Sequence, residues 1–222
     1  MASETGERDW IERLRAFDVC TISDALDRLK LHGVVSGLTQ RSGDGRIAGK
    51  VITVRLGTEP PPGPPRHLCA AAIEAADDCS VIVIEQRTGV EAGCWGGLLT
   101  LAARARKVAG VVAEGLLRDV DEARALGFPV FARGLTARTA RGRIVEKATG
   151  VPVTIGDVPV ETGDFVVADG SGVAFVRRVD IEAVLAAADA IAAREAAMVR
   201  ALNSGAQVSE VLGGTYEHML KS

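Results

Sequence analysis

The sequence has few aromatic residues and no stripe or tail of basic residues. Aromatic side chains make up 4% of its 222 residues, and the formal net charge is -3 at pH 7. Nucleic-acid-binding proteins need clustered positive charge, and they hold single strands by stacking bases on aromatic rings. The composition therefore argues against a nucleic-acid partner. Small residues separate the arginines between Arg133 and Arg143, and we interpret that segment as a solvated surface.

Paired cysteines and long apolar runs are also absent. The four cysteines show no C-x-x-C spacing and no signal peptide is recognisable, so we expect free thiols and a cytoplasmic location. No run reaches the ~18 consecutive apolar residues of a membrane span, so we expect no membrane partner. The glycine patterns of dinucleotide-binding folds and of P-loops are missing too.

Apolar side chains are abundant, at 47% of the residues, and 25% of the residues are charged. This composition can fill a sizeable core, and the length fits one domain. We therefore predict a single domain over residues 1–222, with a core of about residues 20–178. The alanine-rich stretch from Asp180 to Leu202 has apolar residues at helical spacing, which predicts a long C-terminal helix.

Outside its centre the chain combines helices near the start with short strands and turns. Residues Asp9 to Leu31 predict two helices, the second with Thr21 or Ser23 as its N-cap. Asp24 is interpreted as a partner of that helix dipole rather than as a ligand. The proline-rich segment from Glu59 to Arg66 predicts a surface loop, which could be a flap near the site. Strands with no helix between them indicate a mixed sheet, and they are expected at 47–56, 129–132, 143–155, 165–169 and 173–176.

The centre of the chain predicts two consecutive strand–helix units. The first has a strand at 81–84, a glycine-rich turn at 93–97 and a helix at 98–107. The second has a strand at 110–113, a turn at 114–119 and a short helix that ends at Gly127. Both turns should open at the same edge of a parallel pair of strands. Ligands of open α/β sheets bind beyond the carboxyl ends of the strands, so we place the functional site there.

The first turn contains Gly96 and Gly97 directly before the expected helix. Neither residue has a Cβ, and the first N–H groups of a helix have no intrahelical acceptor. Such helix starts favour a carboxylate or a phosphate, although two glycines can also mark only a tight turn. Cys94 in the same turn could be a nucleophile. Because no histidine is paired with it, a small apolar side chain is the simpler interpretation.

The second turn carries Arg118 next to Asp119. A planar guanidinium suits a carboxylate or enolate oxygen, and an aspartate is a hard ligand for Mg²⁺ or Mn²⁺. The alternative is structural. Asp119 and Glu122 have the spacing to cap a helix over residues 120–126, which would leave Arg118 as a surface charge. Spacing alone leaves both interpretations open.

Two extended patterns go beyond these short motifs. From Trp95 to Phe131 the sequence is W-G-G-L-L-x5-A-x4-G-V-V-x2-G-x2-R-D-V-x6-G-F-P-V-F. From Gly156 to Val173 it is G-D-V-x-V-x2-G-D-x-V-V-A-D-x2-G-V. With Asp24-Ala25-Leu26 these patterns resemble the RraA-like family, over roughly residues 20–200. That family includes the 4-hydroxy-4-methyl-2-oxoglutarate (HMG) and 4-carboxy-4-hydroxy-2-oxoadipate aldolases.

The resemblance implies an α/β fold, a layered β/β/α sandwich of the swivelling-domain type with a C-terminal helical extension. It also implies a homotrimer or homohexamer with sites between subunits. Asp119 would bind a divalent metal, Mg²⁺ or Mn²⁺. Arg118 would hold the oxygen of a pyruvyl group whose carboxylate meets the N–H groups of Gly97, Leu98 and Leu99. The metal and the arginine would stabilise a pyruvate enolate as a 4-hydroxy-2-oxo diacid is cleaved, and oxaloacetate could be decarboxylated in the same way.

Two acidic positions bear on the activity that the resemblance implies. The aldolases usually carry Asp or Glu at the position of Gly97, where it positions a water acting as acid or base. Glu91, in the same turn, is the candidate replacement. These enzymes also use an acidic residue from the neighbouring subunit's C-terminal helix. Glu195 is the best match for that residue, with a solvated helix charge as the alternative.

The resemblance leaves two other functions to consider for this chain, a protein-binding regulator and a methyltransferase. Some members are non-catalytic regulators that bind an RNA-degrading endonuclease. The long C-terminal helix favours the lyase, because the regulators resemble shorter chains. A methyltransferase is not expected, since no glycine-rich S-adenosylmethionine loop follows the first strand.

Overall fold

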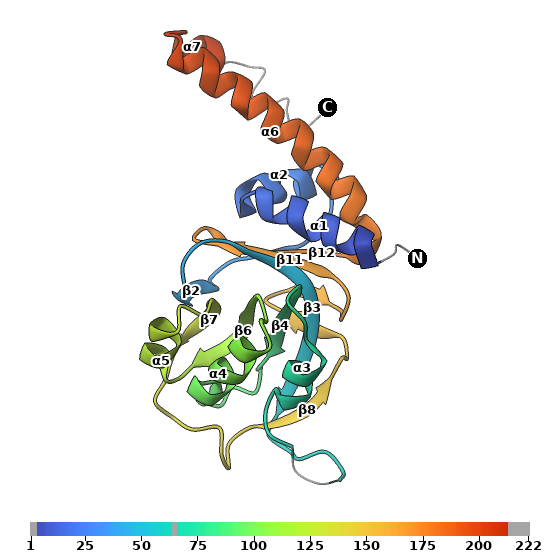
Figure 1. Ribbon diagram of the computed structural model, residues 1–222, viewed down its shortest axis with the longest axis vertical. Coiled ribbons are helices and arrows are strands. Elements are labelled where there is room, and N and C mark those ends of the chain that lie inside the picture. Colours follow the sequence, from blue (N-terminus) through green and yellow to red (C-terminus); the bar gives the residue numbers. More distant parts are fainter. Residues whose placement is uncertain (1–3, 64–65, 213–222) are drawn as a thin grey trace.

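A ten-stranded mixed sheet organises the molecule. The computed structural model describes residues 4–63 and 66–212 (Figure 1). The parallel centre of the sheet consists, in spatial order, of β3 (Ile47–Gly57), β4 (Ser80–Glu85), β6 (Gly110–Leu117) and β7 (Val130–Leu135). Every residue from Ser80 to Ile84 is buried, which is typical of a strand covered on both faces.

Antiparallel strands extend this centre on both sides. A hairpin of β11 (Phe165–Asp169) and β12 (Gly172–Val176) pairs with β3, and β2 (Thr39–Ser42) pairs with β7. The remaining strands of the sheet are β1 (Val34–Val35), β5 (Gly93–Trp95) and β8 (Val145–Thr149). A separate two-stranded hairpin contains β9 (Val153–Ile155) and β10 (Val158–Val160).

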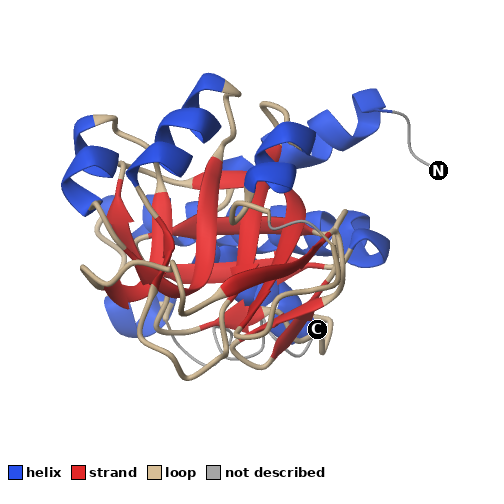
Figure 2. Cartoon of the chain, turned by 90° about the horizontal axis from the view of Figure 1, so that it is seen from below, coloured by secondary structure: helices blue, strands red, loops and turns tan. Residues whose placement is uncertain are grey.

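The strands and helices pack in layers, with three apolar clusters between them. Figure 2 shows these helices and strands from below. One cluster lies between strands, where Val83 and Phe131 of the main sheet meet Ile155 of the small hairpin. A second lies between the sheet and the helices α3 (Ala70–Ala75), α4 (Gly97–Ala105) and α5 (Val120–Ala125). The third joins the outer helices to β11 and β12.

The outer helices come from the two ends of the chain. They are α1 (Glu4–Ala16), α2 (Val19–Arg28) and α6 (Ile181–Asn203). The first half of α6 packs on α2, with the 3-10 turn Arg178–Asp180 leading into it. Its second half and α7 (Val208–Val211) extend away from the body of the molecule (Figure 1). None of the helices in the described ranges has both the length and the apolar character of a membrane span.

The predicted fold class is confirmed. The molecule is an α/β protein with a large mixed sheet in β/β/α layers, and a long C-terminal helix is appended to it. The predicted strand at 47–56, the hairpin around Gly170 and the helix at 180–202 are within one residue or so of the observed bounds. The region 143–155 contains two strands, as the pattern allowed.

Local signals misplaced some element boundaries. Helix α2 begins at Val19, not near Thr21 or Ser23, because Asp18 is the N-cap and accepts from the Thr21 N–H at 2.7 Å. The segment predicted to be a turn at 114–119 is strand as far as Leu117, because β5 and β7 pair with β6 there.

One arginine of the segment interpreted as solvated is structural. Arg133 forms a part-buried ion pair with Glu114 at 2.8 Å, and the same carboxylate accepts from the Gly156 N–H. This pair connects β6 and β7 to the small hairpin. The contact joins residues far apart in the sequence, so residue spacing could not predict it.

Candidate active site

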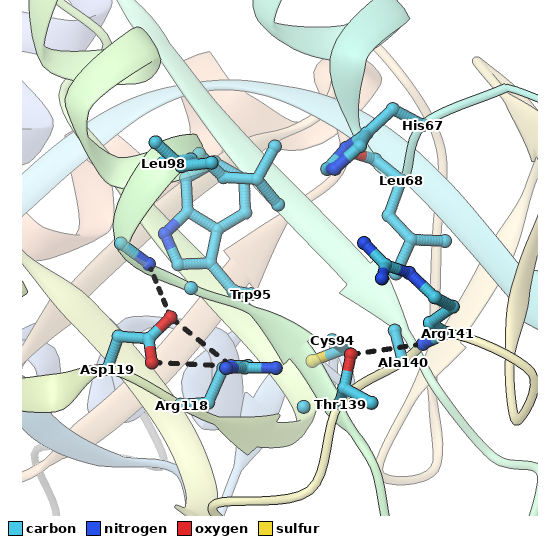
Figure 3. Close-up of a pocket in the computed structure, with 14 residues that line it drawn as sticks. His67, Leu68, Cys94, Trp95, Leu98, Arg118, Asp119, Thr139, Ala140 and Arg141 are labelled. Atoms are coloured by element: carbon cyan, nitrogen blue, oxygen red, sulfur yellow. Dashed lines mark hydrogen bonds and ion pairs between the residues drawn. The ribbon is translucent and has the colours of Figure 1, made fainter.

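A cavity of about 240 Å³ opens where β5 ends and α4 begins, beside the turn after β6 (Figure 3). Its walls bring together Gly97, Leu98 and Leu99 from the first turn with Arg118 and Asp119 from the second. The two turns meet because β5 and β6 are parallel neighbours whose carboxyl ends lie at one edge of the sheet. The predicted site residues other than Glu195 therefore surround one space.

The glycine turn makes room for Arg118. A Cβ built on Gly93 would lie 2.8 Å from Arg118 Cγ, and a Cβ built on Gly96 would lie 3.0 Å from the same atom. The aliphatic stem of Arg118 therefore lies against bare backbone. The Arg118 N–H also donates to the Trp95 carbonyl oxygen at 3.0 Å, which fixes the second turn to the first.

Asp119 has a left-handed backbone conformation, with a φ of 54°, that is uncommon outside glycine. Its carboxylate makes no capping hydrogen bond to α5. Instead Oδ2 accepts from the Gly97 N–H at 3.1 Å, so the side chain is directed toward α4. Asp119 is therefore the N-cap residue of α5 by position, but its side chain does not cap that helix and is held at the start of α4 instead.

Arg118 and Asp119 form an ion pair that leaves donors for a ligand. Arg118 Nε lies 3.3 and 3.2 Å from the two carboxylate oxygens of Asp119, and each side chain is 34% exposed. Within the described ranges, Nη1 and Nη2 have no partner. In Figure 3 the guanidinium reaches from Asp119 into the cavity. A planar group with two free nitrogens suits a carboxylate or enolate oxygen.

The first turn of α4 supplies backbone donors to the same cavity. The Gly97 N–H is occupied by Asp119, whereas the Leu98 and Leu99 N–H groups have no acceptor in the described part of the chain. These amides lie at the positive end of a nine-residue helix, where an anion is favoured. Two of the three predicted backbone donors are thus available to a carboxylate.

Glu122 is a candidate functional residue that sequence reasoning missed. A Cβ built on Gly97 would lie only 1.7 Å from Glu122 Oε2, so this carboxylate fills the space that a side chain at position 97 would enter. Glu122 comes from α5, and its carboxylate lies beside the start of α4. It does not line the cavity itself but shares an adjoining open hollow with Arg118 and Asp119. The only signal for it in the sequence is its spacing from Asp119, which is also the spacing of a helix cap.

The residues present fit a metal that is held only partly by protein. In the described ranges, no three His, Cys, Asp or Glu side chains converge as a ligand set. Mg²⁺ is usually bound by one or two carboxylates and completes its octahedron with water and substrate oxygens. The single carboxylate of Asp119 in the cavity wall matches that donor set, whereas a closed zinc-type site does not.

Trp95 makes a rigid floor under the turn. Its indole Nε1 donates to Thr100 Oγ1 at 2.9 Å, and that hydroxyl donates to the Gly96 carbonyl oxygen at 3.0 Å. The indole stacks on Phe128 with the ring centroids 6.4 Å apart. Because Trp95 and Thr100 are both buried, these bonds fix the path of the backbone where α4 begins.

Cys94 is inert and Glu91 is engaged elsewhere. Burial raises the pKa of the Cys94 thiol to about 12, so the thiolate needed for nucleophilic attack is not formed near neutral pH. The Cys94 side chain is also fully buried, which favours the apolar interpretation over the nucleophile. Glu91 pairs with Arg138 at 3.3 Å and accepts from Thr136 Oγ1, and it does not line the cavity.

Glu195 lies outside the cavity of its own chain. It is on α6, which packs on the opposite side of the molecule from α4 (Figure 1). Burial raises the pKa of its carboxyl, and the nearby charges of Asp18 and Asp24 add to that effect. Asp24, half-buried on α2, is part of this acidic group and does not line the cavity.

The family model described as RraA-like, Aldolase/RraA, matches residues 19–175. The chain belongs to the RraA-like family. A protein of Halalkalibacterium halodurans named "Putative 4-hydroxy-4-methyl-2-oxoglutarate aldolase" is 29% identical over 197 residues, which are 89% of this chain and 90% of that protein. The range that the RraA-like model matches contains every residue that lines the cavity, including the glycine turn, Arg118 and Asp119.

Two further proteins are similar to this RraA-like chain. Protein DlpA of Legionella pneumophila is 29% identical over 189 residues, which are 85% of this chain but only 31% of DlpA, so the chain spans less than a third of that relative. The crystal structure of an uncharacterised protein from Pseudomonas syringae pv. tomato is 27% identical, with a TM-score of 0.82. The match covers 92% of this chain and 96% of that one, and it supports the same fold.

Proposed function

We propose that this RraA-like protein is a divalent-metal-dependent lyase. Its substrate would be a 4-hydroxy-2-oxo diacid such as HMG, which it would cleave to pyruvate. The observation that carries the proposal is the placement of Arg118 and Asp119 opposite the unpaired amides of Leu98 and Leu99 around one cavity. The aldolase name of the H. halodurans relative supports the same reaction class.

Each group of the site has a role in holding a 2-oxo acid. The Leu98 and Leu99 amides would bind its C1 carboxylate, and the Nη groups of Arg118 would donate to its 2-oxo oxygen. When the bond between C3 and C4 breaks, the 4-hydroxyl loses its proton and the electron pair passes to the pyruvyl fragment as an enolate. Arg118 would stabilise the charge that develops on the enolate oxygen. Stabilisation of developing charge is usually the largest single contribution to the catalysis of such reactions.

A metal bound at Asp119, Mg²⁺ or Mn²⁺, would supply Lewis-acid polarisation of the 2-oxo group. The ion pair with Arg118 and the bond from the Gly97 N–H hold the Asp119 carboxylate in place, which supports this role. The enolate is also the product of oxaloacetate decarboxylation, so we propose that reaction as a second activity of the same site.

Proton transfer needs an acidic group, and Gly97 has none. We propose that Glu122, whose carboxylate lies against Gly97, positions the water that exchanges protons with the substrate. In a homotrimer or homohexamer with sites between subunits, Glu195 of a neighbouring copy would add a second acidic group. The raised pKa of the Glu195 carboxyl suits a proton donor.

A pyruvate-release assay tests the proposal. With Mg²⁺ or Mn²⁺ present, we expect the protein to release pyruvate from HMG or from oxaloacetate, and chelation should stop the reaction. Asp119→Asn should reduce the rate by at least about a hundredfold while preserving the fold, because asparagine tolerates the left-handed backbone. If this variant keeps the wild-type rate, the metal role of Asp119 is refuted. If no 2-oxo acid reacts, the non-catalytic regulator becomes the better hypothesis.

A further inference from the structure

A second cavity continues outward from the first. This outer cavity has a volume of about 460 Å³ and is walled by the segment after the proline-rich loop and by the loop before β8. The two cavities share His67, Leu68 and the segment 139–141, so they adjoin one another, and we treat them together as one groove. A ligand whose 2-oxo end lies at Arg118 can extend along this groove.

The outer cavity carries only basic charges. Its charged lining residues are Arg66 and Arg141, and none of its lining residues is an aspartate or a glutamate. The inner cavity differs, because there Asp119 neutralises Arg118. The far part of the groove is therefore suited to an anionic group and disfavours a cationic one.

Arg141 keeps its guanidinium donors free, unlike two nearby arginines of its own segment. Its neighbours are engaged, since Arg138 pairs with Glu91 and Arg143 donates to the Thr139 carbonyl oxygen. Within the ranges that the structure describes, the guanidinium of Arg141 has no such partner, and only its backbone N–H is bonded, to Thr139 Oγ1. Figure 3 shows the guanidinium turned toward His67 across the cavity from Arg118.

His67 is less suited to bind an anion. Its Nδ1 lies 3.1 Å from the Leu68 carbonyl oxygen, which can only accept, so Nδ1 carries the hydrogen. In the neutral ring, Nε2 is then an acceptor and suits a substrate hydroxyl rather than a carboxylate. Of the two arginines that line the outer cavity, Arg66 and Arg141, only Arg141 also lines the inner one, so Arg141 is the cation placed to meet an anion that extends from Arg118.

The geometry points to the outer cavity as the subsite for the second carboxylate of the substrate, with Arg141 as its specificity-determining residue. The guanidinium binds this carboxylate through two parallel hydrogen bonds, while Leu68 and Ala140 contact the carbon chain between the two ends. This assignment rests on the proposed function, because it takes the 2-oxo end to be held at Arg118.

Substrate discrimination tests the assignment. HMG is compared with 4-hydroxy-4-methyl-2-oxopentanoate, in which a methyl group replaces the distal carboxylate. Arg141→Gln should reduce the ratio of the two kcat/KM values, HMG over the monoanion, by about tenfold or more, mainly through the KM for HMG. Arg143→Gln is the matched control, since it removes the same charge from the same segment and lines neither cavity. An unchanged ratio in Arg141→Gln overturns the assignment.

A binding measurement separates this assignment from the lyase proposal. If the wild type turns over no 2-oxo acid, the lyase proposal fails, and 2-oxoglutarate and 2-oxopentanoate are titrated calorimetrically in the presence of Mg²⁺. The subsite predicts tighter binding of 2-oxoglutarate, a preference that Arg141→Gln loses and Arg143→Gln keeps. Equal affinity for the two acids, or no binding of either, overturns the assignment.

Discussion

At the scale of single residues, the Glu122 carboxylate occupies the space that a side chain at position 97 would need. A Cβ at position 97 and the Glu122 carboxylate cannot occupy the same space, since Oε2 lies 1.7 Å from where that Cβ would be. The carboxylate is the far end of a flexible side chain, so a larger residue at position 97 would displace it without disrupting the fold. This gives Gly97 a role beyond a tight turn: it keeps Glu122 beside the start of α4.

Gly97→Ala and Glu122→Gln should therefore impair the same step. We expect each variant to reduce kcat for pyruvate release by about tenfold or more, because general acid–base catalysis typically contributes at least that much. The double variant should be no slower than the worse single variant, since both remove one carboxylate from one place. Steady-state kinetics of the four proteins measure this. Fully multiplicative losses would show that the two residues act independently.

The sequence alone could place Arg118 and Asp119 at the candidate site, but it could not point to Glu122. The first two follow a buried strand at the sheet edge where ligands bind, which a one-dimensional pattern can express. Glu122 is distinguished only by its distance to a residue 25 positions earlier in the chain. For the same reason, the sequence could not tell that Asp119 turns away from its own helix toward α4.

At the scale of elements, the strands β3 and β4 were predicted more accurately than the start of α2 or the end of β6. Strands such as β3 and β4 are defined by many consecutive apolar residues, whereas the start of α2 depends on one contact. Asp18, Thr21 and Ser23 are all competent caps, and the extended backbone at Asp18 decides among them. The length of β6 depends on its pairing with β5 and β7, and strand propensity cannot predict this tertiary pairing.

Asp18→Ala should destabilise the protein by about 1 kcal/mol at neutral pH, the usual cost of losing an N-cap. The Thr21 N–H, with smaller contributions from the Thr21 hydroxyl and Arg46, holds the pKa of the Asp18 carboxyl below its usual range. A depressed folded-state pKa means that this stability is present above the unfolded pKa of about 4 and is lost as the pH falls through the folded value. Urea unfolding should thus show a wild-type advantage at pH 7 that shrinks in acid. An advantage that is constant with pH contradicts the charged cap.

At the scale of the whole molecule, α6 extends away from its own body and its own cavity (Figure 1). Apolar side chains are exposed on its far half and beside the cavity, with Leu98 80% and Val199 55% exposed. We propose that these surfaces meet in a homotrimer or homohexamer, in which α6 of one copy reaches the cavity of another. That arrangement would bring Glu195 to a site that the single chain does not complete.

Subunit mixing tests this arrangement. Asp119→Asn and Glu195→Gln should each be nearly inactive as pure proteins, for different reasons. When the two are co-expressed, some interfaces combine an intact Asp119 from one copy with an intact Glu195 from another, and pyruvate release should return. A mixture no more active than its separate components would place Glu195 outside the neighbouring site.

The central claim is that Asp119 and Arg118, facing the amides of α4, hold a divalent cation and a 2-oxo acid together. The most direct measurement is calorimetric titration with oxalate, an analogue of the pyruvate enolate, in the presence and absence of Mn²⁺. The account predicts that oxalate binds tightly to the wild type only when Mn²⁺ is present, and that Asp119→Asn abolishes this dependence. Oxalate binding that is the same with and without Mn²⁺, or unchanged in Asp119→Asn, would contradict it.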